Sequence, residues 1–152
     1  MTAQARMQNP AFVVPGAMDA LMALSRAERA TGISETVLEL VHLRASQING
    51  CGVCVHMHAA ALRKSGSADE KIDTVAGWRD APYFEDDERA ALALAEGVTR
   101  LADRGDAVPD EVFEEAAAHF DERQLGALIL SIAQVNLWNR LNVTTHQVAG
   151  AW

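Results

Sequence analysis

Apolar residues recur at helical spacing along most of this chain. Leu21, Leu24 and Ala27 mark one such stretch, and no segment alternates apolar and polar residues as a half-buried strand requires. Alanine is abundant, and runs of β-branched residues are short. The pattern therefore predicts an all-α fold of about seven helices, contained in a single domain over residues 1–152.

Capping residues and chain breakers set the expected bounds of these helices. Ser34 is a suitable N-cap for the second helix. Ser67 and Glu70 have the spacing of a capping box, and Asp121 and Gln124 repeat that spacing before the last helix. Residues 1–16 contain two prolines and a glycine, so we expect them to form an arm. The helices are expected over residues 18–30, 34–46, 51–66, 67–77, 85–102, 108–119 and 121–143.

The last predicted helix is apolar on most of its faces, with the sequence LGALILSIAQVNLWNRLNV over residues 125–143. A helix that is apolar all round is either central to a fold or shared between subunits. A chain of 152 residues has little room to enclose such a helix. The pattern therefore favours an oligomer.

Charge and composition narrow the choice of partners and compartment. The net charge of −8 disfavours binding to nucleic acid and to anionic membrane surfaces. The N-terminus lacks the features of a signal peptide, and no segment has the roughly 18 consecutive apolar residues of a membrane span. We therefore expect a cytoplasmic protein, in which a thiol pair stays reduced unless it cycles. A purely structural disulfide is disfavoured for that reason.

Both cysteines of the chain lie in the stretch INGCGVCVHMHAAAL, residues 48–62, together with two of its five histidines. On a helix of ~100° per residue, Cys51, Cys54 and His58 share one narrow face, whereas His56 lies about 160° from His58. Cys54 and His58 are one turn apart, so the imidazole is expected to reach the thiol proton. The spacing therefore groups His58 with the thiols and separates His56 from them.

The position of the C-x-x-C pair after Gly50 suggests that Cys51 begins a helix. Free N–H groups and the helix dipole at that point favour a thiolate, so Cys51 is expected to be the more acidic thiol. The pair is expected to close to a disulfide reversibly. Two alternatives stay open: a zinc site with Cys51, Cys54 and His58 as ligands, and two inert cysteines packed in the core.

The stretch ELVHLRASQINGCGVCVHMH, from Glu39 to His58, resembles the alkylhydroperoxidase D-like branch of the carboxymuconolactone decarboxylase family. The shared signature is Glu39, the pair Cys51 and Cys54, and His58. Residues 77–96 and 135–147 are similar to later helices of the same family. The resemblance implies an all-helical fold that assembles as a homotrimer or a homohexamer. It also implies thiol peroxidase or disulfide reductase chemistry.

The resemblance assigns a role to each residue of the signature. It implies that Cys54 attacks the peroxide and that Cys51 resolves the product to a disulfide. His58 is then the base, and Glu39 orients it or relays protons to it. Some members of the family have a histidine directly before the second cysteine, where this chain has Val53. That difference is expected to weaken the proton relay or the peroxidase rate.

The function that follows is reduction of a hydroperoxide at the expense of an external dithiol, for which the resemblance suggests a lipoyl-bearing adaptor protein. We expect no bound cofactor and no metal at this site. One alternative is a redox sensor or interaction module that uses the same pair as a switch without turnover. Another is the decarboxylase activity of the family, which the presence of the C-x-x-C pair disfavours.

Several other residues are interpreted from spacing alone. Glu39 lies on a polar helix face, so periodicity by itself predicts a solvent-exposed side chain. Arg44 falls within an apolar arc, where its stem is expected to pack and its guanidinium to reach solvent; a pair with a buried acid and a subunit contact are the alternatives. His146 is expected to cap the last helix or lie at the surface. Trp78, Trp138 and Trp152 are interpreted as packing residues.

Overall fold

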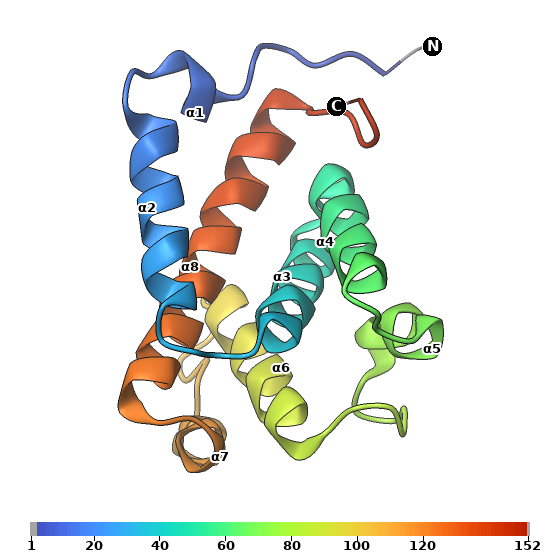
Figure 1. The fold of residues 1–152 in the computed structure, drawn as a ribbon, viewed down its shortest axis with the longest axis vertical. Helices are drawn as coiled ribbons and strands as arrows, with labels where there is room; N and C mark the ends of the chain where they lie inside the picture. Colours follow the sequence, from blue (N-terminus) through green and yellow to red (C-terminus); the bar gives the residue numbers. More distant parts are fainter. Residues whose placement is uncertain (1–2, 152) are drawn as a thin grey trace.

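The computed structural model describes residues 3–151, which form eight α-helices and no β-strand, as the all-α prediction required (Figure 1). Residues 1–2, which begin the predicted arm, and Trp152 lie outside the described residues. The elements are α1 (Pro10–Val13), α2 (Ala17–Arg29), α3 (Glu35–Asn49), α4 (Gly52–Lys64), α5 (Asp69–Asp73), the 3₁₀ helix η1 (Val75–Gly77), α6 (Asp86–Thr99), α7 (Asp110–His119) and α8 (Glu122–Thr145).

Helix α3 is the central element of the fold. It packs against α4, α6 and α8, and every residue from Val37 to Leu43 is buried. One apolar cluster joins α3 to α6, α7 and α8, and a second joins it to α4, α5 and α6. Because apolar partners cover the other sides of α3, its polar residues Glu39 and His42 remain to face the space between α2 and α4.

Helix α8 is not fully enclosed within the single chain, as the length of the sequence led us to expect. It runs beside α2, α3 and α6 (Figure 1). Its side chains Leu130, Leu137 and Val143 are exposed. The helix that neighbouring elements cover on most sides is α3. None of the described helices, α8 included, is long and apolar enough to cross a membrane. The oligomer inferred from the apolar faces of α8 stays a prediction.

The predicted helix starts at Ser34 and Asp121 are confirmed. The hydroxyl of Ser34 accepts a hydrogen bond from the backbone N–H of Val37. Asp121 and Gln124 form a reciprocal capping box, in which each side chain accepts from the other residue's backbone N–H. These caps satisfy N–H groups that have no partner within a helix. They fix where the two longest helices begin.

The predicted capping box at Ser67 is wrong. Helix α5 has Ala68 at its N-cap, with no side-chain hydrogen bond at that end. The backbone N–H of Ser67 instead bonds the carbonyl of Leu62 at 3.0 Å, next to Gly66 with its φ of 92°. This is the hydrogen-bond pattern of a helix C-terminus that ends on a left-handed glycine. Ser67 therefore terminates α4, and the next helix starts after it.

The predicted arm is partly helical. Asn9 caps the short helix α1 by accepting the backbone N–H of Ala11 at 2.9 Å, and Pro10 lies at its first position. Proline is tolerated there because its missing N–H would have no partner within the helix. Pro10 was interpreted as a chain breaker, whereas it begins a helical turn. The segment before α1 lies near the C-terminal end of α8, where the N–H of Arg6 bonds the carbonyl of Thr145.

Arg44 pairs with a buried acid, which was one of the alternatives for this residue and not the favoured one. Its Nε lies 2.8 Å from Oε1 of Glu96, which also accepts from the indole N–H of Trp78 at 3.0 Å. The guanidinium of Arg79 bonds the other oxygen of the same carboxylate. The favoured expectation that the guanidinium reaches solvent is therefore wrong, and the alternative of a buried ion pair is confirmed. Trp78 packs in the core, as predicted, and in addition donates a hydrogen bond to this cluster.

Candidate active site

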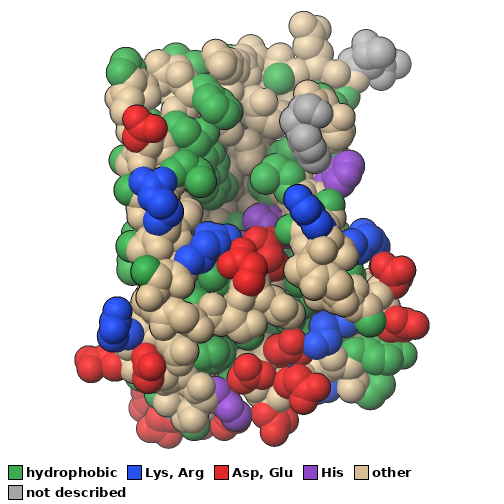
Figure 2. Space-filling view, viewed as in Figure 1, with side chains coloured by type: hydrophobic (Ala, Val, Ile, Leu, Met, Phe, Trp, Pro, Cys, Tyr) green, Lys and Arg blue, Asp and Glu red, His purple; other side chains and the backbone are tan. Residues whose placement is uncertain are grey.

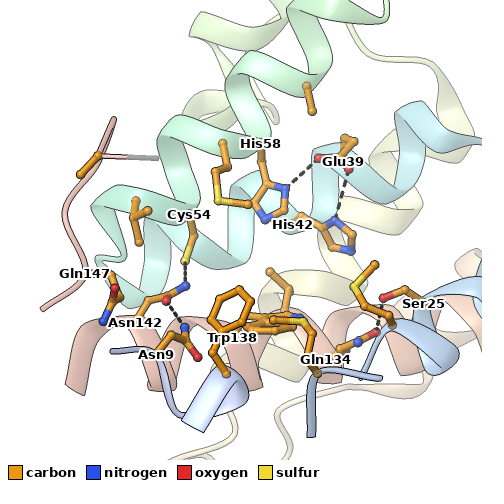
Figure 3. A pocket seen from close by; sticks show the side chains of 18 of the residues that line it. Asn9, Ser25, Glu39, His42, Cys54, His58, Gln134, Trp138, Asn142 and Gln147 are labelled. Carbon is orange, nitrogen blue, oxygen red and sulfur yellow. Dashed lines mark hydrogen bonds and ion pairs between the residues drawn. The ribbon is translucent and has the colours of Figure 1, made fainter. Parts of the chain in front are cut away.

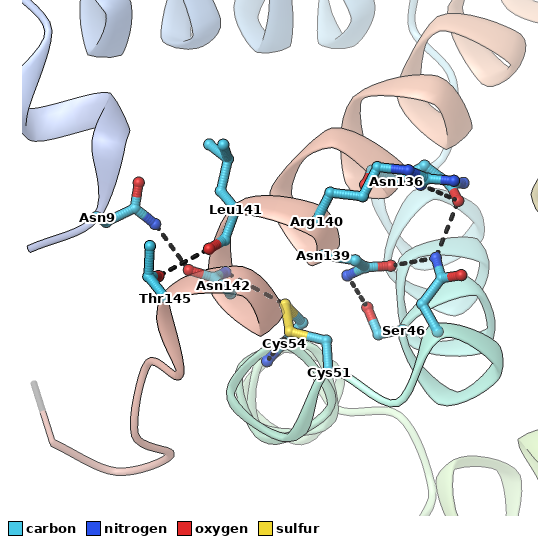
Figure 4. Close-up of a disulfide and its surroundings, with 11 residues drawn as sticks. Asn9, Ser46, Cys51, Cys54, Asn136, Asn139, Arg140, Leu141, Asn142 and Thr145 are labelled. Atoms are coloured by element: carbon cyan, nitrogen blue, oxygen red, sulfur yellow. Dashed lines mark hydrogen bonds between the residues drawn. A yellow bond between two sulfur atoms is a disulfide. The ribbon is translucent and has the colours of Figure 1, made fainter. Parts of the chain in front are cut away.

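The link between α3 and α4 positions the cysteine pair. Helix α3 ends at Gly50, which adopts a left-handed φ of 69° that favours glycine. Cys51 then caps α4, and its Sγ lies 3.3 Å from the backbone nitrogen of Cys54. The two cysteines form a disulfide, with their Cα atoms 5.3 Å apart (Figure 4). The predicted helix start at Cys51 and the ability of the pair to close are confirmed.

A cavity of about 1020 Å³ opens beside this disulfide. Figure 2 shows the molecule hollowed between α2 and α4, with hydrophobic side chains along the α2 side and charged side chains at the lower end. Cys54 lines the cavity, whereas Cys51 does not. Both cysteines are almost fully buried, with exposed fractions of 1% and 2%. Cys54 is therefore the sulfur that a molecule in the cavity would meet.

Most of the cavity wall is apolar, and it comes from parts of the chain that are far apart in sequence. Helices α2, α3, α4 and α8 contribute, together with the segments at both ends of the described chain. The larger apolar side chains are Phe12, Met18, Met22, Val53, Met57, Val135 and Trp138. Methionine is flexible and polarizable, so a wall with three methionines can adapt to ligands of different shape. The lining suits an organic molecule of substantial size.

Glu39 and His58 meet on one side of this cavity. Oε2 of Glu39 lies 2.7 Å from Nδ1 of His58 (Figure 3). Glu39 is 8% exposed, so its predicted solvent-facing position is wrong, and the family resemblance located it better than periodicity did. Burial alone would raise the pKa of Glu39, but the neighbouring imidazoles of His42 and His58 outweigh it and lower the pKa to about 2. Glu39 therefore stays ionised at neutral pH and holds the imidazole of His58.

His42 is a third member of this group that was not singled out as a site residue. Its Nε2 lies 2.6 Å from the hydroxyl of Ser131, and its Nδ1 lies 3.8 Å from Oε1 of Glu39. Its ring centroid is 4.8 Å from that of His58. Burial lowers the pKa of His42, which keeps the ring neutral at pH 7. The sequence held a signal for it, because His42 follows Glu39 by three residues on the same helix face.

Among the described residues, the group that could hold a metal ion is Glu39, His42 and His58, whose ligand atoms lie within 4.8 Å of one another. The zinc alternative considered above required Cys51 and Cys54 as thiolate ligands. In this structure the two sulfurs are bonded to each other, and neither cysteine belongs to the set. The short Glu39–His58 hydrogen bond uses two of the three ligand groups. The arrangement can therefore serve as an acid–base pair.

Asn142 of α8 contacts the reactive pair directly, and nothing in the sequence pointed to it. Its Nδ2 lies 3.3 Å from Sγ of Cys54, and its Oδ1 accepts a hydrogen bond from Asn9 at 2.7 Å (Figures 3 and 4). Asn142 is separated from Cys54 by most of the chain, so only the packing of α8 against α4 brings the two together. Spacing along one helix could not reveal that contact.

The other two histidines of interest lie where their spacing predicted. His56 is exposed and does not line the cavity, and its ring lies beside Gly150. His146 is the C-cap of α8, with a left-handed φ of 52°. The separation of His56 from His58 is therefore confirmed. A capping position for His146 is confirmed as well.

Glu28 is a buried carboxylate in the floor of the cavity, and its Oε1 has no hydrogen-bond partner among the described residues. Burial raises the pKa of Glu28. This effect outweighs the hydroxyl of Ser131 and the charge of Arg29, both of which lower the pKa. A carboxylate with a raised folded-state pKa stabilises the protein below its unfolded pKa and loses that contribution as the pH rises. Glu28 therefore costs stability at neutral pH.

We expect Glu28→Gln to raise the free energy of unfolding at pH 7 and to change it little at pH 4. Glutamine has the same shape and carries no charge to desolvate. Urea unfolding of both proteins at the two pH values checks this. Glu114→Gln, which removes an exposed carboxylate of α7, is the matched control. A stability gain at pH 4 that equals the gain at pH 7 would contradict the titration of Glu28.

Comparison with known proteins identifies the family and the fold of this chain. The model of the carboxymuconolactone decarboxylase family matches residues 15–97, a range that includes Glu39, both cysteines and His58. The uncharacterised protein YdfG of Bacillus subtilis is 34% identical over 131 residues, which are 86% of this chain and 88% of YdfG.

Two solved structures share the fold. A protein of unknown function from Agrobacterium tumefaciens, described as a candidate antioxidant defence protein AhpD, is 34% identical, with a TM-score of 0.88 over 98% of this chain and 100% of that one. The debrominase Bmp8 is 21% identical, with a TM-score of 0.78 over 90% of this chain and 73% of Bmp8. At that identity Bmp8 shows a common fold alone.

Proposed function

This chain belongs to the carboxymuconolactone decarboxylase family, on its alkylhydroperoxidase D-like branch, and from that premise we propose that it is a thiol-dependent peroxidase. In this proposal the Cys51–Cys54 pair reduces organic hydroperoxides, and an external dithiol reduces the pair again. One observation carries the proposal: the sulfur of Cys54 lines an apolar cavity that also holds the hydrogen-bonded pair of Glu39 and His58.

The first half of the reaction takes place at Cys54. His58, oriented by Glu39, accepts the thiol proton of Cys54. The thiolate attacks the outer oxygen of the hydroperoxide, so that an S–O bond forms and the O–O bond breaks. The leaving alkoxide takes the proton from His58 and departs as an alcohol. Cys54 is left as a sulfenic acid, and the peroxide has been reduced by two electrons.

The second half closes and reopens the disulfide. The thiol of Cys51 attacks the sulfur of Cys54, and the hydroxide that leaves takes the Cys51 proton to form water. The product is the Cys51–Cys54 disulfide. An external dithiol, for which we propose a lipoyl group, then exchanges with this disulfide. It gives up two electrons and two protons and becomes a disulfide itself.

We propose further that the protein works as a homotrimer or homohexamer. Leu130, Leu137 and Val143 of α8 are exposed in the single chain, and such side chains are commonly buried between subunits. Light scattering at micromolar concentration tests the assembly. A monomer at that concentration would rule it out.

The function is tested by hydroperoxide consumption with purified protein, with cumene hydroperoxide as substrate and dihydrolipoamide as reductant. Catalytic turnover supports the proposal. If the protein reduces one equivalent of peroxide and no dithiol then supports further turnover, the pair would be a redox switch instead. Decarboxylation of carboxymuconolactone that survives alkylation of both thiols would assign the activity of the wider family. Because the debrominase Bmp8 has also been solved as a variant in complex with 2,3,4-tribromopyrrole, a brominated pyrrole belongs in the substrate panel.

We expect Trp138→Ala to lower kcat/KM for cumene hydroperoxide about tenfold or more, since it removes a large apolar contact from the cavity. Hydrogen peroxide has no apolar part to contact this wall, so its kcat/KM is expected to stay unchanged. Steady-state kinetics with the two substrates check this. An equal loss for both would mean that Trp138 supports the fold and does not bind substrate.

A further inference from the structure

We propose that Asn142, held in one orientation by Asn9, donates a hydrogen bond to the sulfur of Cys54 and makes Cys54 the reactive thiolate of the pair. The catalytic meaning of this inference rests on the proposed function, which it deepens. It adds two amides to a site that otherwise depends on ionisable groups.

The orientation of Asn142 follows from a chain of hydrogen bonds that starts at a backbone donor. The N–H of Ala11 bonds Oδ1 of Asn9 at 2.9 Å, which fixes the amide oxygen of Asn9 toward α1. Nδ2 of Asn9 therefore faces Asn142, whose Oδ1 accepts it at 2.7 Å (Figure 3). Asn142 is left with Nδ2 directed at Cys54, 3.3 Å from Sγ. The sulfur therefore meets a donor and not an oxygen.

Asn9 can hold this orientation because its segment is fastened to the end of α8. The N–H of Arg6 bonds the carbonyl of Thr145 at 2.8 Å, and the amide of Gln147 donates to the carbonyl of Met7 at 2.9 Å. Asn9 itself is buried. A donor that the fold already holds in place costs little reorganisation when charge develops on its acceptor.

The extra donor changes the balance between the two thiols. Cys51 has the advantage of the helix start, and its sulfur accepts the backbone N–H of Cys54. Apolar surroundings disfavour a thiolate, and both sulfurs are almost fully buried. A hydrogen bond to the charged form lowers a pKa, and Asn142 gives one to Cys54 from outside the helix. We infer that this bond offsets the helix-start advantage of Cys51 and directs ionisation to the sulfur that lines the cavity.

The ionisable neighbours of Cys54 come from the other side of the site. They are the disulfide partner Cys51, His58 on α4, Glu39 and His42 on α3, and the cavity-lining residues Arg26, Glu28 and Arg29 on α2. Among the described residues that line the cavity, α8 and the segment before α1 contribute none that is charged. The amide of Asn142 is therefore the polar contact that Cys54 receives from α8.

The test measures the pKa of the Cys54 thiol from the pH dependence of its alkylation by iodoacetamide. A Cys51→Ser background leaves one thiol to titrate and retains a residue suited to the N-cap. Asn142→Ala is expected to raise the pKa by about one unit, and to slow alkylation at neutral pH roughly tenfold. Asn9→Ser is expected to raise it by less, because serine still caps α1 but lacks the second donor that orients Asn142.

Asn139→Ala is the matched control. Asn139 lies one turn before Asn142 on α8 and bonds Ser46 and Asn49, not a sulfur. Its variant is expected to lose stability while the Cys54 pKa stays unchanged. An unchanged pKa in Asn142→Ala, or an equal rise in Asn139→Ala, would overturn the proposal. If circular dichroism shows that Asn142→Ala does not fold, the pKa in Asn9→Ser decides.

The readout separates this proposal from the proposed function. Alkylation requires neither peroxide nor reductant, so a pKa that does not move counts against the amide pair alone. If Asn142→Ala raises the Cys54 pKa but the wild type shows no hydroperoxide turnover, the proposed peroxidase function fails and the role of Asn142 stands.

Discussion

Cys54→Ser is expected to abolish hydroperoxide turnover, with a fall in kcat/KM on the order of 10³ or more, as when other enzymes lose a covalent nucleophile. The reason is the position of the two sulfurs. Cys54 lines the cavity and Cys51 does not, so a hydroperoxide in the cavity meets Cys54 first. Coupled peroxide-consumption assays on purified wild type and variant provide the measurement.

Cys51→Ser is the matched comparison, and it is expected to behave differently. Cys54 keeps its base, so one equivalent of peroxide should still be reduced in a single turnover. The sulfenic acid then has no intramolecular partner, and it is expected to be trapped by dimedone in Cys51→Ser but not in Cys54→Ser. Retention of the single turnover by Cys54→Ser, with its loss in Cys51→Ser, would reverse the two roles.

His58→Ala is expected to slow peroxide attack by on the order of 10² to 10⁴, which is the usual loss when a general base is removed. The imidazole lies one turn after Cys54 and is held by Glu39 at 2.7 Å. Without it, the Cys54 thiol loses its proton acceptor, and its pKa is expected to rise. The pH dependence of Cys54 alkylation and the single-turnover peroxidase rate measure the two effects separately.

Two further variants show whether the loss is specific to His58. Glu39→Gln removes the carboxylate that is ionised at neutral pH, so it should reproduce the His58→Ala effect more mildly. His56→Ala should change the rate little, because His56 does not line the cavity. Equal losses from His56→Ala and His58→Ala would falsify the assignment of His58 as the base.

The helices were predictable from sequence because their signals are local. Asp121 with Gln124, Ser34 and Gly50 act within a few residues of the helix ends that they define. The error at Ser67 shows the limit of such signals. The same residue was available to end α4 or to begin α5, and the competition was decided by Gly66, whose left-handed backbone completes the C-terminus of α4.

The site was predictable only where its residues follow one another on α3 and α4. Spacing on a single helix was enough to group Cys54 with His58 and to exclude His56. Glu39 required the family resemblance, because a polar helix face looks the same whether it meets water or a polar cavity. Asn142 and Asn9 could not be found from spacing at all, because their contacts with Cys54 and with each other join distant parts of the chain.

The α3–α4 hairpin has a consequence for how this protein can diverge. The ionisable residues of the proposed reaction, from Glu39 to His58, belong to one continuous hairpin. Most of the opposite wall of the cavity, including Met18, Met22 and Trp138, belongs to α2 and α8. Mutations that reshape that wall can therefore accumulate while the reactive hairpin stays intact. A laboratory redesign for a new substrate has the same freedom, with α2 as the helix to vary and the hairpin as the part to keep.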